Sequence, residues 1–198
     1  MAASRRKELS HERIVDAAAR VIRREGYSGV GVADVMKEAG LTHGGFYAHF
    51  PSRDALLAAA MDRAGKDGAA RLSQGMARRR AEGASPLRAW VDTYLGEAHL
   101  AGCEGGCPVS ALASEIPRQS PEVREVAASR VQRLLEGIQR VLPAGAGEHA
   151  AVAVTSTLVG ALQLARALGD NAQGRAVLAS ARQAVLDQYD HEGGSPSH

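Results

Sequence analysis

The strongest constraint on the fold is a set of three short segments in the first fifty residues, each with apolar residues at helical spacing. Gly26 follows the first segment and Gly40 the second, at positions typical of a helix C-terminus. Thr42 is a candidate N-cap for the third segment, a very short helix over 43–49. We predict one small core from the apolar residues of these segments: Ile14, Ala17, Ala18, Val21, Ile22, Val32, Val35, Met36, Leu41, Phe46 and Phe50.

The second and third segments, with the glycine turn between them, have the pattern of a helix-turn-helix. The outward face of the third helix combines small residues with hydrogen-bond donors: Thr42, His43, Gly44, Tyr47 and Ala48. Small residues let a helix enter a major groove about 12 Å wide. The helix N-terminus also presents N–H groups and a positive dipole to phosphates. The pattern therefore favours binding of double-stranded DNA.

The remaining chain is also predicted to be helical. The 198 residues are 45% hydrophobic and only 4% aromatic, which favours helices over a β-sandwich or barrel. No strand pattern or internal repeat is found. We expect an all-α protein of about nine helices, with Ser10 as the N-cap of the first. Beyond the three short segments, helices are expected over 52–81, 86–98, 108–116, 122–142, 148–168 and 172–189.

We divide the chain into four regions: a disordered basic arm (1–9), a helix-turn-helix domain (10–51), a larger helical domain (52–190) and a disordered tail (191–198). The net charge of +2 lies entirely in residues 1–54, which hold nine Lys and Arg against seven Asp and Glu. This distribution indicates that the N-terminal end faces a polyanion. The low total charge argues against an architectural DNA binder without sequence preference.

No targeting segment is expected. No apolar run follows the basic residues near Met1, so a signal peptide is not predicted. The longest uncharged stretch, 150–165, is shorter than the roughly 18–20 residues of a membrane-spanning helix. We expect a soluble, cytoplasmic protein that does not bind membranes.

Residues 14–56 resemble the TetR/AcrR family of transcriptional regulators, most specifically in Gly40-Leu41, Phe46-Tyr47-x-His49-Phe50 and Ser52-Arg53-x-x-Leu56. The resemblance implies an N-terminal DNA-binding domain and a C-terminal ligand-binding and dimerisation domain. It also implies that Tyr47, His49 and Arg53 hold operator phosphates. The residues nearest the bases would be Thr42, His43, Gly44 and Gly45. Val32 departs from the family, which usually has Thr or Ser at the start of the second helix.

A helix-turn-helix protein reads two half-sites as a dimer. We place the homodimer on helices 148–168 and 172–189, as a four-helix bundle across a twofold axis. The candidate contact residues are Val159, Gly160, Ala161, Leu162, Ala165, Val177, Val185 and Leu186. The alternative is that these helices only complete the core of the monomer.

The resemblance further implies an effector cavity for an unknown small molecule. Candidate lining residues are polar or amphipathic residues among apolar ones, together with the two cysteines: Met61, Trp90, Tyr94, His99, Cys103, Cys107, Leu112, Gln163 and Arg166. No cofactor is expected. For each residue alone, core packing or surface exposure is the competing explanation.

Cys107 precedes Pro108 and is therefore a candidate helix N-cap, where the helix dipole would lower the pKa of the thiol. Cys103 is then a candidate resolving partner, and the pair a candidate sensor of oxidants or electrophiles. Three alternatives stay open. The cysteines could be small residues beside a cavity, metal ligands with His99 but without a fourth ligand, or part of a thiol enzyme using Cys107.

The favoured interpretation is a homodimeric transcriptional regulator and not an enzyme. It would act as a repressor that leaves a palindromic operator when an effector binds or a cysteine is modified.

Overall fold

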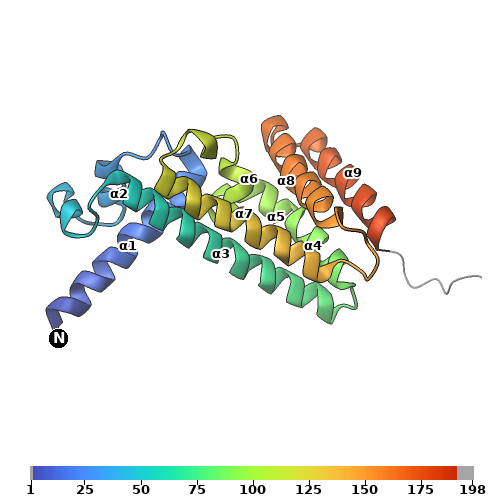
Figure 1. Ribbon diagram of the computed structural model, residues 1–198. Helices are drawn as coiled ribbons and strands as arrows, with labels where there is room; N and C mark the ends of the chain where they lie inside the picture. Colours follow the sequence, from blue (N-terminus) through green and yellow to red (C-terminus); the bar gives the residue numbers. More distant parts are fainter. Residues whose placement is uncertain (1, 191–198) are drawn as a thin grey trace, which may run out of the picture. The chain divides into compact units, whose positions relative to one another are not determined.

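The computed structural model describes residues 2–190, and every regular element in that range is helical (Figure 1). The N-terminal elements are α1 (Ala2–Glu25), α2 (Val32–Glu38) and the short 3₁₀ helix η1 (His43–Ala48). They are followed by α3 (Arg53–Ala81), α4 (Pro86–Tyr94), α5 (Glu97–Ala101), η2 (Cys103–Gly105), α6 (Pro108–Leu112) and η3 (Ile116–Arg118). The chain continues with α7 (Pro121–Val141), α8 (Ala150–Leu168) and α9 (Ala172–Tyr189). The predicted all-α class is confirmed, and the described residues form nine α-helices.

The chain forms two compact units whose boundaries differ from the predicted domains. Unit 1 combines the residues up to Ala69 with Cys103–Arg130, and unit 2 combines Ala70–Gly102 with the residues from Val131 onward. The structural units do not coincide with the predicted division after residue 51, and the reason lies in packing. The first turns of α3, together with α6 and α7, contribute to the same core as the helix-turn-helix, through these buried residues: Leu56, Leu57, Met61, Leu112 and Val123.

The core of unit 1 contains all the residues predicted for it from the sequence. Ile14, Val35 and Met36 are almost completely buried, and Phe46 and Phe50 are buried with them. Val32 and Leu41 are partly buried and pack against this cluster. Helices too short to be stable alone are therefore held together by shared apolar side chains.

The first helix begins earlier than predicted. Residues 2–9 are helical rather than a disordered arm, and Ser10 lies inside α1 instead of capping it. Arg, Lys, Glu and Leu are strong helix formers, so 5–9 extends the helix. The Ser4 hydroxyl also donates a hydrogen bond to Glu8 across one turn, at 3.2 Å. Met1 and the predicted tail, 191–198, lie outside the described residues.

The predicted turns and caps are largely confirmed. Gly26 and Gly40 have φ of 75° and 69°, the left-handed conformation that ends α1 and α2. Ser52 caps α3 by accepting a hydrogen bond from the Ala55 N–H at 3.0 Å. Thr42 occupies the N-cap position of η1, but its side chain makes no cap hydrogen bond.

Unit 2 is built around α8 and α9, which pack along each other, while α4 packs on α9. The buried side of this helix pair includes several residues predicted for the dimer interface: Ala161, Leu162, Ala165, Val185 and Leu186. These five belong to the core of the single chain, so that part of the prediction is wrong. Val159, Gly160 and Val177 are partly exposed.

Helix α8 is the one described helix long and apolar enough to cross a membrane by length and composition alone. Residues spaced along one side of it, among them Val154, Leu158 and Ala165, are buried inside unit 2. This is the pattern of a core helix.

Candidate nucleic-acid interface

The third element of the helix-turn-helix is a 3₁₀ helix of six residues, and one buried side chain anchors it to the core of unit 1. Phe46 is buried in the core of unit 1, and the next residue, Tyr47, is 75% exposed. The Tyr47 ring meets Phe46 edge to face, with 5.1 Å between ring centroids. The contact with the buried Phe46 ring thus restrains a Tyr47 ring that is mostly exposed.

The other predicted base-facing residues lie around Tyr47. Thr42, His43, Gly44 and Ala48 are exposed, and Gly45 is partly buried against Met36. Gly44 has open space around the position of a Cβ atom, and its φ is not in the left-handed region. The fold itself therefore does not require glycine at residue 44.

His11 on α1 lies beside η1 and His49, at the edge of unit 1 that carries the predicted DNA contacts. It was not identified from the sequence. Its ring stacks on Phe50 at 4.6 Å, and Phe50 in turn lies 5.8 Å from Phe46. The His49 ring is 6.1 Å from His11. The signal in the sequence was that His11 continues the helical face of Ile14 and Ala18 toward the N-terminus.

His49 is partly buried, and its Nδ1 atom is buried without a hydrogen-bond partner. Burial lowers the pKa of His49 below its ordinary value, and the positive charges of His11 and Lys7 lower it further. The uncharged form of the ring is therefore favoured relative to a free histidine, and a cation, Lys7, contributes to this effect. An anion placed beside it would find an electrostatically favourable position.

Arg53 has a structural role that the sequence did not indicate. Its Nε donates a hydrogen bond to the Val30 carbonyl at 3.1 Å, and an Nη atom donates to the carbonyl of Tyr27. The guanidinium thus holds the turn between α1 and α2 against the start of α3. A guanidinium has five N–H donors, so these two bonds leave donors for a phosphate.

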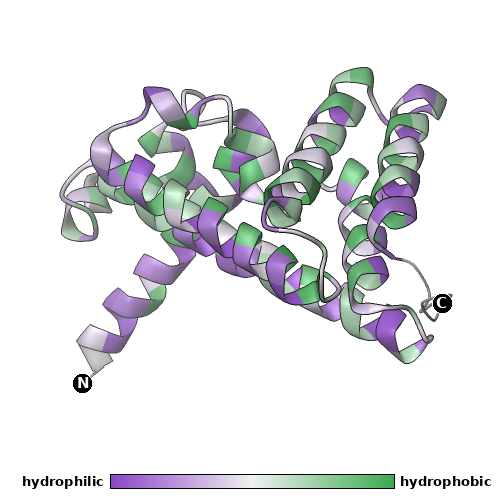
Figure 2. Cartoon of the chain, turned by 45° about the vertical axis from the view of Figure 1, so that its right-hand side comes forward, coloured by the Kyte–Doolittle hydropathy of each residue, from purple (hydrophilic) through white to green (hydrophobic). Residues whose placement is uncertain are grey.

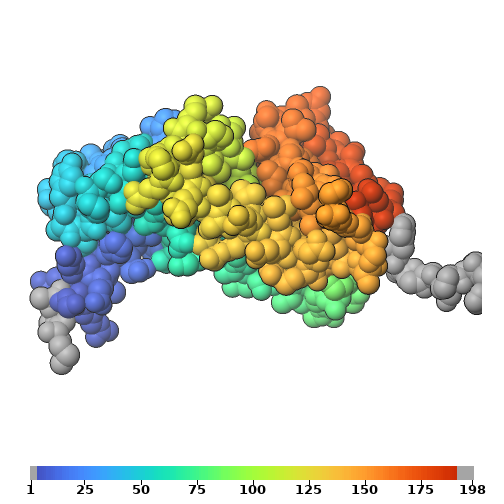
Figure 3. Space-filling view, in the orientation of Figure 1, coloured from blue at the N-terminus to red at the C-terminus, as the bar shows by residue number. Residues whose placement is uncertain are grey.

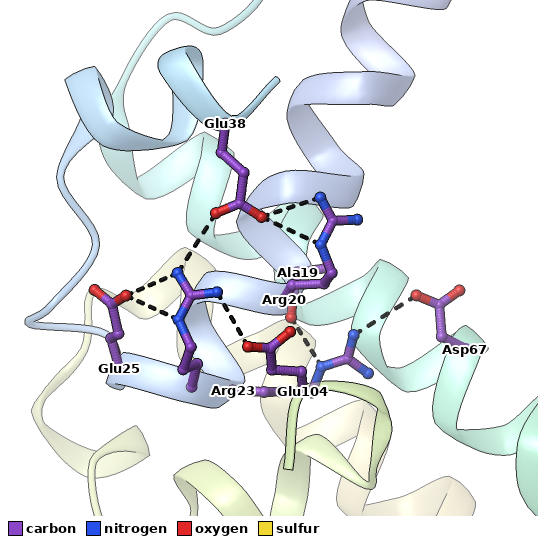
Figure 4. A network of polar contacts seen from close by, with 8 residues as sticks. Ala19, Arg20, Arg23, Glu25, Glu38, Asp67 and Glu104 are labelled. Carbon is purple, nitrogen blue, oxygen red and sulfur yellow. Dashed lines mark hydrogen bonds and ion pairs between the residues drawn. The ribbon is translucent and has the colours of Figure 1, made fainter. Parts of the chain in front are cut away.

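Behind this edge, a network of charged residues ties α1 to α2 and to the cysteine segment (Figure 4). Arg20 pairs with Glu38 at 3.0 Å. Arg24 pairs with Glu38 at 3.4 Å and with Glu104 at 3.1 Å. Glu104 lies in η2, between the two cysteines, so the network joins η2 to the helix that supports the helix-turn-helix.

Arg23 lies beneath this network and is only 4% exposed. It donates hydrogen bonds to the carbonyls of Ala19 at 2.8 Å, Ala64 at 3.4 Å and Gly106 at 3.2 Å. Its side chain therefore bridges α1, α3 and the cysteine segment. In the sequence it is indistinguishable from a surface arginine in the last turn of a helix, so no pattern revealed its burial.

The two cysteines are reduced and partly buried within unit 1. The Cys103 thiol donates a hydrogen bond to the Arg23 carbonyl, with 2.9 Å between sulfur and oxygen. Cys107 occupies the N-cap position of α6, as predicted, but makes no side-chain cap hydrogen bond, and α6 has only five residues. Cys103 thus makes a direct contact with α1.

The predicted effector residues divide between the two units. Met61 and Leu112 are fully buried in the apolar core of unit 1, as core packing requires. Cys103 and Cys107 belong to the same unit, whereas the other five belong to unit 2: Trp90, Tyr94, His99, Gln163 and Arg166.

Within unit 2, three of these residues come together. Tyr94 and His99 meet edge to face at 4.8 Å, and His99 Nδ1 lies 2.8 Å from the Tyr94 carbonyl. Arg166 donates to the His99 carbonyl at 2.7 Å. Burial, with a smaller contribution from the charge of Arg166, lowers the pKa of His99 to about 4.

Trp90 packs its ring close to Gly137 in the same unit, where a Cβ atom would lie 2.3 Å from the indole. Its indole Nε1 is buried without a hydrogen-bond partner. Gln163 is partly exposed. The buried indole N–H of Trp90 is therefore a candidate ligand contact.

Among residues 2–190, no three His, Cys, Asp or Glu side chains are grouped so as to hold a metal ion. The alternative of a metal site formed by His99, Cys103 and Cys107 is therefore not supported.

Comparison with known proteins agrees with the helix-turn-helix. Residues 14–60 match the family described as bacterial regulatory proteins, tetR family, and residues 83–184 match the tetracyclin repressor-like C-terminal domain. An uncharacterized HTH-type transcriptional regulator of Mycobacterium tuberculosis H37Rv is 33% identical over 175 residues, covering 80% of this chain and 85% of that protein.

Solved structures share the fold over nearly the whole chain. A TetR transcriptional regulator from Chloroflexus aurantiacus has a TM-score of 0.71 at 25% identity, with 92% of this chain and 95% of that one covered. The reduced form of Escherichia coli NemR has a TM-score of 0.75 at 18% identity, with 91% and 96% covered. The second likeness concerns the fold alone. With both family matches and the mycobacterial relative in agreement, the chain belongs to the TetR family of bacterial transcriptional regulators.

Proposed function

We propose that this TetR-family DNA-binding regulator is a cytoplasmic repressor that binds a palindromic operator as a homodimer. The observation that carries the proposal is the geometry of Tyr47, which is 75% exposed and braced on the buried Phe46. An exposed, fixed aromatic hydroxyl suits contact with a phosphate, because little side-chain entropy is lost when it binds.

The division of roles follows from position. Tyr47, His49 and Arg53 contact phosphates and fix the register, whereas Thr42, His43, Gly44 and Gly45 face the base edges. Gly44 supports this assignment because nothing within the chain requires glycine there. Close approach of a groove surface would explain the missing side chain.

The test is selection of bound duplexes from a random pool, followed by affinity measurements on Tyr47→Phe and Tyr47→Ala. A palindrome is expected from the selection, with half-sites separated by about one helical turn or a multiple of it. Both variants should weaken operator binding, Tyr47→Ala more strongly, without changing the selected sequence. Unchanged affinity of Tyr47→Ala at fixed salt would refute the phosphate contact.

The dimer would form on the exposed side of α8. Val152, Leu164 and Leu168 are large apolar residues of α8 that the single chain leaves exposed. Ser156 and Gly160 lie between Val152 and Leu164 at four-residue spacing and are small. These small residues allow close approach, since a Cβ at Gly160 would meet nothing within 4 Å. We expect sedimentation to show a dimer at micromolar concentration.

Release from DNA would follow ligand binding near Trp90, Tyr94, His99, Gln163 and Arg166, or modification of a cysteine. For the cysteine route, the support is the contact of η2 with α1. The Cys103 sulfur would add to the β-carbon of an electrophile of the α,β-unsaturated carbonyl class, and a proton would add to the α-carbon. The resulting thioether has no S–H to donate to the Arg23 carbonyl.

N-Ethylmaleimide provides the test of this route. It is expected to weaken operator binding by the wild type and by Cys107→Ser, but not by Cys103→Ser. The serine hydroxyl of Cys103→Ser can still donate a hydrogen bond to the Arg23 carbonyl, but the variant has no reactive sulfur at this position. Loss of binding in the treated Cys103→Ser protein would assign the effect to Cys107, and no effect on the wild type would exclude the cysteine route.

A thiol enzyme using Cys107 is a poorer candidate. His99, the base considered for it, is held at the Tyr94 carbonyl and has its pKa lowered to about 4 by burial. A base is most effective when its pKa is close to the working pH.

A further inference from the structure

The beginning of α1 extends beyond the core of unit 1. Residues 4–9 are all exposed, and the first buried residue of α1 is Ile14. In Figures 1 and 3 this start of the helix stands out from the rest of unit 1, and Figure 2 shows that it is mainly hydrophilic. We call residues 4–9 the basic extension because it carries Arg5, Arg6 and Lys7 against one acid, Glu8.

Lys7 lies on the side of the helix that continues the buried face. Lys7, His11, Ile14 and Ala18 are spaced i, i+4, i+7 and i+11, so they share one face of α1. Ile14 and Ala18 are buried in unit 1, and the His11 ring stacks on Phe50. Lys7 is one turn further toward the N-terminus and therefore lies past the rim of the core, on the side of His49.

The electrostatics agree with this placement. The positive charge of Lys7 contributes to lowering the pKa of His49, so the two groups are within electrostatic range of each other. The acids that follow on α1 do not neutralise Lys7. Glu12 pairs with Arg63 of α3 at 2.8 Å, and Asp16 pairs with the same guanidinium at 2.6 Å.

The other two cations of the basic extension lie on different faces of the helix. Arg6 precedes Arg13 by two turns on the same face, and the Arg13 guanidinium reaches Gly40, where a Cβ atom would lie 2.6 Å from its Nη2. Arg5 lies about 160° around the helix from Lys7. Arg6 is therefore on the helix-turn-helix side, whereas Arg5 faces away.

We propose that Lys7, assisted by Arg6, is a further DNA-contacting residue that holds backbone phosphates of the duplex bound by η1. This inference rests on the proposed DNA contact of Tyr47 and His49. The partner is the phosphate backbone because Lys7 lies on the side of His11 and His49, next to the proposed DNA contacts, and a lysine ammonium binds phosphate as a point charge.

The experiment measures operator affinity of the full-length protein as a function of salt for Lys7→Gln, with Arg5→Gln as the matched control. Each lost phosphate contact should reduce the slope of log affinity against log salt concentration by about 0.9. We expect that reduction per subunit for Lys7→Gln and an unchanged slope for Arg5→Gln. In ethylation interference, one phosphate whose ethylation weakens binding by the wild type should no longer weaken binding by Lys7→Gln.

The outcomes separate this inference from the proposed function. If Tyr47→Ala weakens binding while Lys7→Gln leaves the slope and the ethylation pattern unchanged, the Lys7 contact is refuted and the function stands. Equal slope reductions in Lys7→Gln and Arg5→Gln would also refute it, because they indicate long-range charge rather than a contact on one face. Unchanged binding by Tyr47→Ala as well would refute both. Since both substituted residues are exposed on a helix, far-ultraviolet circular dichroism should confirm that each variant folds like the wild type.

Discussion

The two units differ in how completely each buries its own apolar surface. In unit 1, the large exposed hydrophobic residues are Tyr47 and Leu9, which stand alone. In unit 2, three aliphatic residues of one helix are exposed: Val152, Leu164 and Leu168. A single aromatic ring with a polar end suits a polar, charged partner, whereas several aliphatic side chains suit another protein surface. The difference supports the proposal that unit 1 binds DNA and unit 2 binds the second protomer.

The largest expected effect tests this assignment directly. Leu164→Glu would place a carboxylate in the proposed twofold interface of each protomer, and an uncompensated buried charge costs about 3–5 kcal/mol. We expect sedimentation to show mainly monomer, with greatly weakened operator binding.

Leu9→Glu is the matched control, because Leu9 is 59% exposed and Leu164 is 62% exposed. It should leave the dimer intact. A dimer that persists in Leu164→Glu, or dissociates in Leu9→Glu, would reverse the assignment of the two surfaces.

The helix-turn-helix could be predicted from the sequence because its determinants are local. Gly40 ends α2 in a left-handed conformation, and the four-residue spacing of Phe46 and Phe50 orients η1. The dimer surface could not be assigned residue by residue, because α8 has apolar residues on two sides. Only packing shows that Ala161 and Leu162 face the core and that Leu164 does not.

The units could not be delimited from the sequence for a similar reason. The pattern of α3 is continuous from Arg53 to Ala81, yet the helix contributes to both units. Arg23 shows the same limit at the level of one residue. Its burial depends on carbonyls of Ala64 and Gly106, which are distant in the sequence.

A smaller effect concerns the acid stability of unit 2. Burial lowers the pKa of His99 to about 4, so the unfolded chain binds this proton more readily than the folded one. The stabilising contribution is fully present above pH 6.5 and is lost as the pH falls toward 4, with about 3 kcal/mol lost in total. His99→Gln should lose less stability than the wild type between pH 7 and pH 4.5, as measured by urea unfolding. Equal losses in the two proteins would show that other groups cause the acid sensitivity.

The smallest expected effect concerns His49 of unit 1, and it sharpens the contrast between the two units. The pKa of His49 is also lowered, but in the proposed complex a bound phosphate beside His49 would supply a negative charge that raises the pKa again. DNA binding should therefore take up a proton, and operator affinity should rise a few-fold as the pH falls from 8 to 6. His49→Gln should flatten that pH dependence. His11→Gln measures how much the neighbouring His11 ring contributes to it. An affinity that is independent of pH in the wild type would mean that no phosphate approaches His49. Protonation would thus destabilise unit 2 at His99 and, in the proposed complex, strengthen DNA binding at His49.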